Sequence, residues 1–245
     1  MLISVKSLRN VWGVKPKGVL HVGAHEAEEL EAYTSNGWMP ITWVEAQASK
    51  IEYLKKKLPK ESNYLIDAAV WDKSNVRLIL KITNNTLSTS LLELNTHSLR
   101  HPEVVVESTH EVVTSTLDDL KLPTPVDYLS LDIQGSELKA LKGFQVGLKN
   151  INWVYTEINK EALYKGCAIV DEIDDFLVTK GFKRELTVWT KFGWGDALYV
   201  RTGNLSATRR FLGIFWIQAS RFKSLYHGAK HKIKMKLLKA SAKGA

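Results

Sequence analysis

Short apolar runs alternate with amphipathic segments through the first 200 residues of the chain. The apolar runs predict five strands, at 18–23, 41–46, 63–70, 126–133 and 151–158. Apolar residues at helical spacing predict helices after four of them, at 26–37, 50–58, 136–144 and 170–181. Two further runs, 182–189 and 196–202, predict an antiparallel pair. This alternation is typical of an α/β fold with a doubly wound, mostly parallel seven-stranded sheet covered by helices on both faces.

Residues 71–125 interrupt this alternation. The run VRLILKI at 76–82 predicts an additional strand. The segment 84–102 is rich in Thr, Ser and Asn and predicts a long loop on one side of the sheet. Loops of this length inside a compact domain are usually functional or disordered, so the segment is a candidate for a functional role.

The positive charge of the chain is concentrated at its C-terminal end. Residues 204–245 contain ten Lys or Arg and no Asp or Glu, so subtracting this +10 from the net +8 leaves −2 for residues 1–203. From Phe211 onward, apolar residues recur at helical spacing without an intervening proline. We therefore divide the chain into a folded domain, 1–203, and a basic amphipathic helical tail, 204–245, whose charge implies an anionic partner.

The tail predicts a location as well as a partner. A basic amphipathic helix with Phe, Trp and Leu on one face suits an anionic membrane surface. The first alternative is packing against a partner protein or a second subunit. The second is nucleic-acid binding, which the net charge of −2 on residues 1–203 supports little. The N-terminal residues lack the apolar core of a secretory signal, and no stretch approaches the ~20 apolar residues of a membrane span. We expect a cytoplasmic protein, peripheral on the inner membrane face.

Cysteine content narrows the chemistry. Cys167 is the only cysteine, which excludes an intrachain disulfide and a Cys-rich zinc site. This fits a reducing compartment.

Acidic residues stand at the predicted strand ends. In a doubly wound sheet, ligands bind beyond the carboxyl ends of the strands. Four of the five predicted strand ends offer a carboxylate, and the other is followed by a glycine turn; these residues are Glu45, Asp67, Asp132, Glu157 and Gly23. Glu45 lies about twenty residues beyond Gly23, where an acid can accept hydrogen bonds from two ribose hydroxyls. The sequence therefore predicts a nucleoside pocket.

The first turn indicates which nucleoside. A dinucleotide fingerprint has three glycines, whereas this turn has only Gly23, and three acids, Glu26, Glu28 and Glu29, crowd the helix start. These acids would repel a pyrophosphate. They suit a ligand with a positive charge, such as S-adenosylmethionine, and Asp67 beside the small Ala68 suits an adenine edge.

Seven motifs occur in this order: VLHVGAHEAEE, WVEAQ, LIDAAVWD, STSLL with a following HP, LDIQGSELKALKGF, YTEIN and WGDALYV. In kind and order they resemble FkbM-type S-adenosylmethionine-dependent methyltransferases, from about residue 15 to 202. The resemblance implies a class I, Rossmann-like methyltransferase sheet of seven strands. It also implies methyl transfer to an oxygen, usually a hydroxyl of a sugar or a natural product.

The resemblance assigns the cofactor to matching positions, which are Gly23, Ala24, Glu45, Ala46, Asp67 and Ala68. The family's first motif often reads DVGANxG, whereas this chain has His21 and Ala27 there. We therefore expect Glu26 or His25 to substitute in holding the methionine amino group. His21 is included as a cofactor residue, with a satisfied core histidine as the alternative, and Asp132 is expected to border the cofactor.

Methyl transfer to a hydroxyl needs a base, or a metal that lowers the hydroxyl pKa. The strands that end at Asp132 and Glu157 should be neighbours about 5 Å apart. The two carboxylates could then share a proton, hold the acceptor hydroxyl or bind a divalent ion, of which they would be the ligands. His101, and after it His97, are further base candidates from the long loop, and Trp194 and Asp196 could line the same mouth.

Structural roles compete with these assignments: Asp132 could only cap the following helix, Glu157 could pair with a surface lysine, and the two loop histidines could be solvated. The favoured function is O-methylation of a sugar hydroxyl in a polysaccharide, glycolipid or related glycan. An RNA methyltransferase using the basic tail is the second hypothesis, although LDIQG lacks the Asn/Asp-Pro-Pro-aromatic signature of base-amino methylation. A non-catalytic, membrane-associated binding module is the third.

Overall fold

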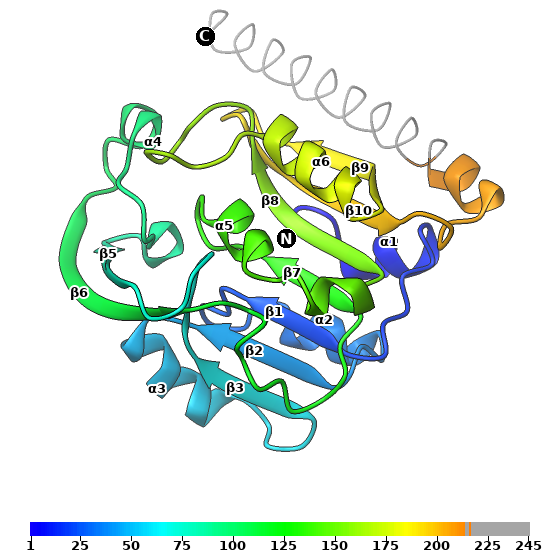
Figure 1. Ribbon diagram of the computed structural model, residues 1–245, viewed down its shortest axis with the longest axis horizontal. Coiled ribbons are helices and arrows are strands. Elements are labelled where there is room, and N and C mark those ends of the chain that lie inside the picture. The colour runs from blue at the N-terminus through cyan, green and yellow to red at the C-terminus, as the bar shows by residue number, and fades with distance from the viewer. Residues whose placement is uncertain (214–215, 217–245) are drawn as a thin grey trace, which may run out of the picture.

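The computed structural model describes residues 1–213 and 216, and its centre is a seven-stranded sheet in the order β3-β2-β1-β7-β8-β10-β9 (Figure 1). Its strands are β1 (Val19–Val22), β2 (Ile41–Glu45), β3 (Asn63–Asp67), β7 (Tyr128–Leu131), β8 (Trp153–Asn159), β9 (Phe182–Trp189) and β10 (Trp194–Arg201). The first five in this order pair in parallel, whereas β10 runs antiparallel to β8 and to β9. The predicted fold class is confirmed, and the strand order reverses between β1 and β7, which is where such sheets bind ligands.

Helices cover both faces of the sheet. They are α1 (Val5–Asn10), α2 (Leu30–Ser35), α3 (Ala48–Lys57), α4 (Thr96–Arg100), α5 (Glu137–Lys142) and α6 (Val170–Thr179), with 3-10 turns η1 (Thr86–Ser88) and η2 (Gly147–Asn150). Because successive side chains of a strand point to opposite faces, Val19 packs with α1, α2 and α3, whereas Leu20 packs with α5 and α6. The two faces thus bury separate apolar clusters.

A second sheet, in the order β4-β6-β5, is built from residues 69–115 and includes β4 (Ala69–Val70), β5 (Arg77–Thr83) and β6 (Val106–Ser115). The predicted strand at 76–82 is confirmed as β5. The single strand predicted over 63–70 is wrong at its end, because Ala68 donates its N–H to the Glu45 carbonyl at 2.9 Å and the chain then enters the second sheet. In Figure 1, β5 and β6 lie to the left of the main sheet.

The basic tail lies mostly outside the described residues. Residues 207–213 are helical, and Trp216 packs edge-on against Trp12 at a centroid distance of 5.2 Å. The remainder of the predicted amphipathic helix, 214–215 and 217–245, lies outside the described residues. No helix within the described ranges is long and apolar enough to cross a membrane.

Candidate functional site

The turn after β1 brings the chain against the end of β7. Gly23 has a φ of +87°, and its N–H donates to the Val44 carbonyl at 2.9 Å. A Cβ on Gly23 would overlap the carbonyl oxygen of Asp132. Glycine is therefore needed here for two reasons, the positive φ and the close approach of two strand ends.

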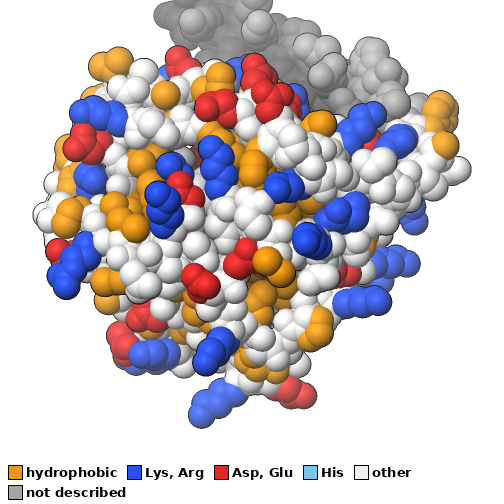
Figure 2. Space-filling view, viewed as in Figure 1, with side chains coloured by type: hydrophobic (Ala, Val, Ile, Leu, Met, Phe, Trp, Pro, Cys, Tyr) orange, Lys and Arg blue, Asp and Glu red, His pale blue; other side chains and the backbone are white. Residues whose placement is uncertain are grey.

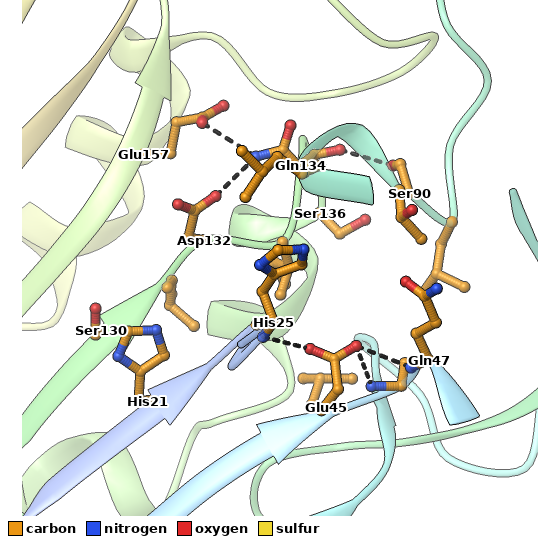
Figure 3. Close-up of a pocket in the computed structure, with 18 of the residues that line it drawn as sticks. His21, His25, Glu45, Gln47, Ser90, Ser130, Asp132, Gln134, Ser136 and Glu157 are labelled. Atoms are coloured by element: carbon orange, nitrogen blue, oxygen red, sulfur yellow. Dashed lines mark hydrogen bonds between the residues drawn. The ribbon is translucent and has the colours of Figure 1, made fainter. Parts of the chain in front are cut away.

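Glu45, at the end of β2, is fixed by backbone donors. Its carboxylate accepts hydrogen bonds from the backbone N–H of His25 at 2.8 Å, Ala46 at 2.9 Å and Gln47 at 2.8 Å (Figure 3). A carboxylate has about four acceptor positions, so one remains for a ligand hydroxyl. The hydrogen bond from His25 holds the Glu45 carboxylate beside the turn that follows Gly23.

His25 joins the first turn to the long loop. Its Nδ1 lies 2.6 Å from Glu28 Oε1, and its Nε2 lies 2.8 Å from Thr86 Oγ1 in η1. Burial raises the pKa of Glu28, but the hydrogen bonds from His25 and from the backbone outweigh burial and lower that pKa to about 2. Glu28 therefore stays ionised at the rim of the site.

Asp132 and Glu157 are brought together, as their strand-end positions predicted, and a glutamine stands between them. The side-chain amide of Gln134 donates to Asp132 Oδ1 at 2.7 Å and to Glu157 Oε2 at 3.3 Å (Figure 3). The Tyr164 hydroxyl donates to Gln134 Oε1 at 2.6 Å, which fixes the orientation of the amide. Gln134 is not evident from sequence patterns, because its role depends on Tyr164, which lies far along the chain.

The carboxylates of this cluster titrate at unusual pH. Loss of hydration among surrounding protein atoms, and then the charge of Asp196, raise the pKa of Asp132 to about 6, although part of the residue is exposed to solvent. Burial, and then the charge of Asp132, raise the pKa of Glu157 well above its usual range. Burial also raises the pKa of Glu137 to about 7, and this residue, which the sequence analysis missed, accepts hydrogen bonds from the N–H groups of Ile133 and Gly135.

Asp196 is tied to the N-terminal segment. The Leu2 N–H donates to Asp196 Oδ2 at 2.6 Å, and the Tyr155 hydroxyl donates to the same oxygen. The Ile3 N–H in turn donates to the Tyr155 hydroxyl at 3.2 Å. Both hydrogen bonds to Asp196 are accepted by Oδ2, and they tie this carboxylate to the N-terminal segment.

Two adjoining cavities open at these carboxylates. The first has a volume of about 280 Å³ and is bordered by seven predicted site residues, namely His21, Gly23, His25, Glu45, Ala46, Asp132 and Glu157. The second has a volume of about 360 Å³ and is bordered by Asp132, Glu157, Asp196 and the predicted loop residues His97 and His101, together with Trp194. The two cavities therefore meet at Asp132 and Glu157.

Four predicted cofactor residues do not border either cavity: Ala24, Glu26, Asp67 and Ala68. Glu26 instead pairs with Lys50 at 2.5 Å, and Asp67 is exposed. Three apolar residues, Ala69, Val70 and Leu80, border the first cavity beyond the break in the predicted third strand. Only the position of that break, which the apolar pattern does not reveal, would have identified them.

His21 combines both predicted roles. Its side chain is buried, and its Nδ1 lies 3.1 Å from the Tyr33 hydroxyl, as expected for a satisfied core histidine. It nevertheless borders the first cavity. Burial lowers the pKa of His21, so the ring is neutral at pH 7.

Unpaired polar atoms in the first cavity favour a bound ligand. The hydroxyl oxygens of Thr89 and Ser136 are buried without a hydrogen-bond partner among the described residues, and both residues border this cavity. A buried polar group without a partner is costly, so a polar ligand fits here. In the part of the chain that the structure describes, no group of three or more His, Cys, Asp or Glu residues is arranged to hold a metal ion.

Comparisons with known proteins give one family match and several similar solved structures. Residues 21–184 match the model of the methyltransferase FkbM domain. No curated protein matches the sequence. Similar solved structures include the magnesium protoporphyrin IX methyltransferase of Synechocystis PCC 6803 with bound S-adenosylmethionine. This protein is 10% identical with a TM-score of 0.44, and the match covers 81% of the present chain and 74% of the methyltransferase.

Two more solved structures are similar to this chain. TrmK of M. capricolum, in complex with S-adenosylhomocysteine, is 9% identical with a TM-score of 0.45, and the match covers 84% of the present chain and 71% of TrmK. A TehB-like methyltransferase of Corynebacterium glutamicum is 9% identical with a TM-score of 0.45, and the match covers 82% of the present chain and 89% of the TehB-like chain.

Proposed function

Because the chain belongs to the FkbM methyltransferase family, we propose that it transfers the methyl group of S-adenosylmethionine to a hydroxyl oxygen of a sugar in a polysaccharide, glycolipid or related glycan. The observation that carries this proposal is the meeting of two cavities at Asp132 and Glu157. One cavity suits the methyl donor, the other suits the acceptor, and the acids lie where the two ligands would meet.

The chemistry of the first cavity fits S-adenosylmethionine. This cofactor supplies an electrophilic methyl group on a positively charged sulfur. Glu28, Glu29 and Glu45 border the cavity and give it the negative potential that such a ligand needs. The remaining acceptor position of Glu45 suits a ribose hydroxyl, and the unpaired hydroxyls of Thr89 and Ser136 are further polar partners.

Asp132 is the general base in this account. A sugar hydroxyl is a poor nucleophile at neutral pH, and a base with a pKa near the working pH is the most effective. With a pKa of about 6, Asp132 is mostly ionised at pH 7 and can accept the hydroxyl proton. Burial and the charge of Asp132 raise the pKa of Glu157, which favours its protonated form, and that form can donate a hydrogen bond to the acceptor. His101 is the second candidate base, and its Nδ1 lies 3.2 Å from Glu103 Oε1.

The face of the molecule shown in Figure 2 gives little support to an RNA acceptor. On the face in Figure 2, basic and acidic side chains are interspersed rather than separated into a basic groove. A glycolipid acceptor at a membrane agrees with the basic composition of 204–245, and peripheral attachment through this segment remains part of the proposal.

The acceptor atom can be identified from the product. We expect incubation with S-adenosylmethionine carrying a ¹³C methyl group, and with extracts of glycans, glycolipids, RNA or protein, to give an O-methyl carbon signal in the glycan or glycolipid fraction. The NMR shift of the new methyl carbon distinguishes an oxygen from a nitrogen acceptor. Label that appears only in RNA, or only as an N-methyl signal, would refute the proposed acceptor.

A further inference from the structure

A row of aromatic rings borders the second cavity. His97 lies 5.4 Å from Tyr164 and 5.1 Å from His101, measured between ring centroids, and His101 lies 4.8 Å from Phe192. All four residues border the cavity, as does Trp194. Aromatic walls with a few placed polar groups are typical of sites for small organic ligands, and these rings give a ring-shaped ligand a surface to pack on.

His97 has an unpaired polar atom in this wall. His97 is only 8% exposed, and its Nδ1 has no hydrogen-bond partner among the described residues. Its Nε2 lies at the long distance of 3.4 Å from Ser88 Oγ. Burial and the neighbouring His101 lower the pKa of His97, so at neutral pH its ring is neutral and offers one donor and one acceptor. A ligand hydroxyl could pair with such a group without a charge being buried.

The charges around the second cavity select against anions. Asp132 and Asp196 border it together with Glu157, whose raised pKa favours the neutral acid, and none of the described residues that border it is a Lys or an Arg. Met1 also borders it, but its ammonium group is paired with Glu29 at 3.2 Å. An anionic ligand would lose its hydration and find no basic side chain in return. A neutral or amino-bearing ligand avoids this penalty.

From the aromatic wall, the unpaired His97 nitrogen and the acidic side chains that border the second cavity, we propose that this cavity is a subsite for a sugar ring without negative charge. His97 is then a specificity-determining residue that pairs with a ring hydroxyl. This inference deepens the proposed function and rests on it. It excludes uronic acids and phosphorylated rings from the cavity and admits neutral and amino sugars.

The test measures binding of three rings that differ in one substituent, namely methyl glucoside, methyl glucosaminide and methyl glucuronide. Saturation-transfer NMR is recorded on the full chain with saturating S-adenosylhomocysteine. We expect the glucoside and the glucosaminide to bind, and the glucuronide to bind at least ~10-fold more weakly. Equal affinity for the glucuronide would overturn the charge selection, and no binding by any of the three would overturn the subsite.

His97→Phe tests the specificity role, because it keeps an aromatic ring and removes both nitrogens. We expect roughly 10-fold weaker binding of the glucoside, partial recovery in His97→Gln, and unchanged affinity for S-adenosylhomocysteine. The matched control is His110→Phe, because His110 is exposed on β6 and borders neither cavity. Unchanged glucoside affinity in His97→Phe would overturn the role of His97, whereas failure of the wild type to bind S-adenosylhomocysteine would refute the proposed function itself.

Discussion

Asp132→Asn is expected to lower kcat by roughly 10²- to 10⁴-fold, the usual contribution of a general base. The asparagine keeps the shape of the side chain and can still contact Gln134, but it cannot accept the proton of the acceptor hydroxyl. Affinity for S-adenosylmethionine should change little, because the first cavity keeps Glu28, Glu29 and Glu45. Steady-state kinetics and calorimetry on the same preparation separate the two effects.

The pH profile identifies the base. In the wild type, kcat/KM should rise with pH through about 6, because the protonated form of Asp132 cannot accept a proton. This rise should be absent from Asp132→Asn. Asp175→Asn is a matched control, since Asp175 is exposed on α6 and borders neither cavity. A variant at position 132 that retains wild-type kcat and the same rise would transfer the role of base to His101.

Stability provides an independent control on this variant. The raised pKa means that folded Asp132 binds its proton more tightly than the unfolded chain does. Its contribution to stability is therefore fully present below the unfolded pKa of about 4 and is lost as the pH rises through the folded pKa of about 6. Because asparagine has no such loss, the variant should be at least as stable as the wild type at pH 7.5, so a loss of activity there cannot be attributed to unfolding.

Gly23→Ala is expected to abolish binding of S-adenosylmethionine and to lower the melting temperature. The new Cβ would overlap the Asp132 carbonyl oxygen, so the turn after β1 and the end of β7 would have to separate. The positive φ of 87° adds a conformational cost on the order of 1–2 kcal/mol. Denaturant unfolding and calorimetric titration measure the two effects.

Gly37→Ala isolates the steric part of this effect. Gly37 has a φ of +71°, and a Cβ there would meet no atom within 4 Å. It should therefore incur the conformational cost alone and bind S-adenosylmethionine normally. If the two variants lose the same stability and both bind the cofactor, the close contact between Gly23 and Asp132 does not shape the site.

The main sheet and the acidic strand ends could be predicted because they follow from local patterns. Apolar runs bounded by helices determine parallel strands, and parallel strands end at one edge of the sheet. Glu45, Asp132 and Glu157 are therefore placed together by topology alone. Their juxtaposition did not depend on any detail of side-chain packing.

The rest depended on tertiary contacts. β6 escaped prediction because most of its residues are exposed, so its sequence VESTHEVVTS lacks the alternation of a half-buried strand. Asp67 and Ala68 were assigned to the pocket because they stand at a strand end, but the chain turns there into the second sheet, and Ala69 and Val70 border the cavity instead. Gln134 takes its place from Tyr164 and Ser90, neither of which is its neighbour in sequence.

Calorimetric titration of the wild type, Glu45→Ala and the exposed control Glu107→Ala tests most directly whether the first cavity binds S-adenosylmethionine through Glu45. We expect the wild type and the control to bind alike. Glu45→Ala should bind roughly 10- to 100-fold more weakly, because it loses a charge-assisted hydrogen bond to the ligand and three backbone donors lose their partner. Absence of binding by the wild type, or equal binding by Glu45→Ala, would contradict this account.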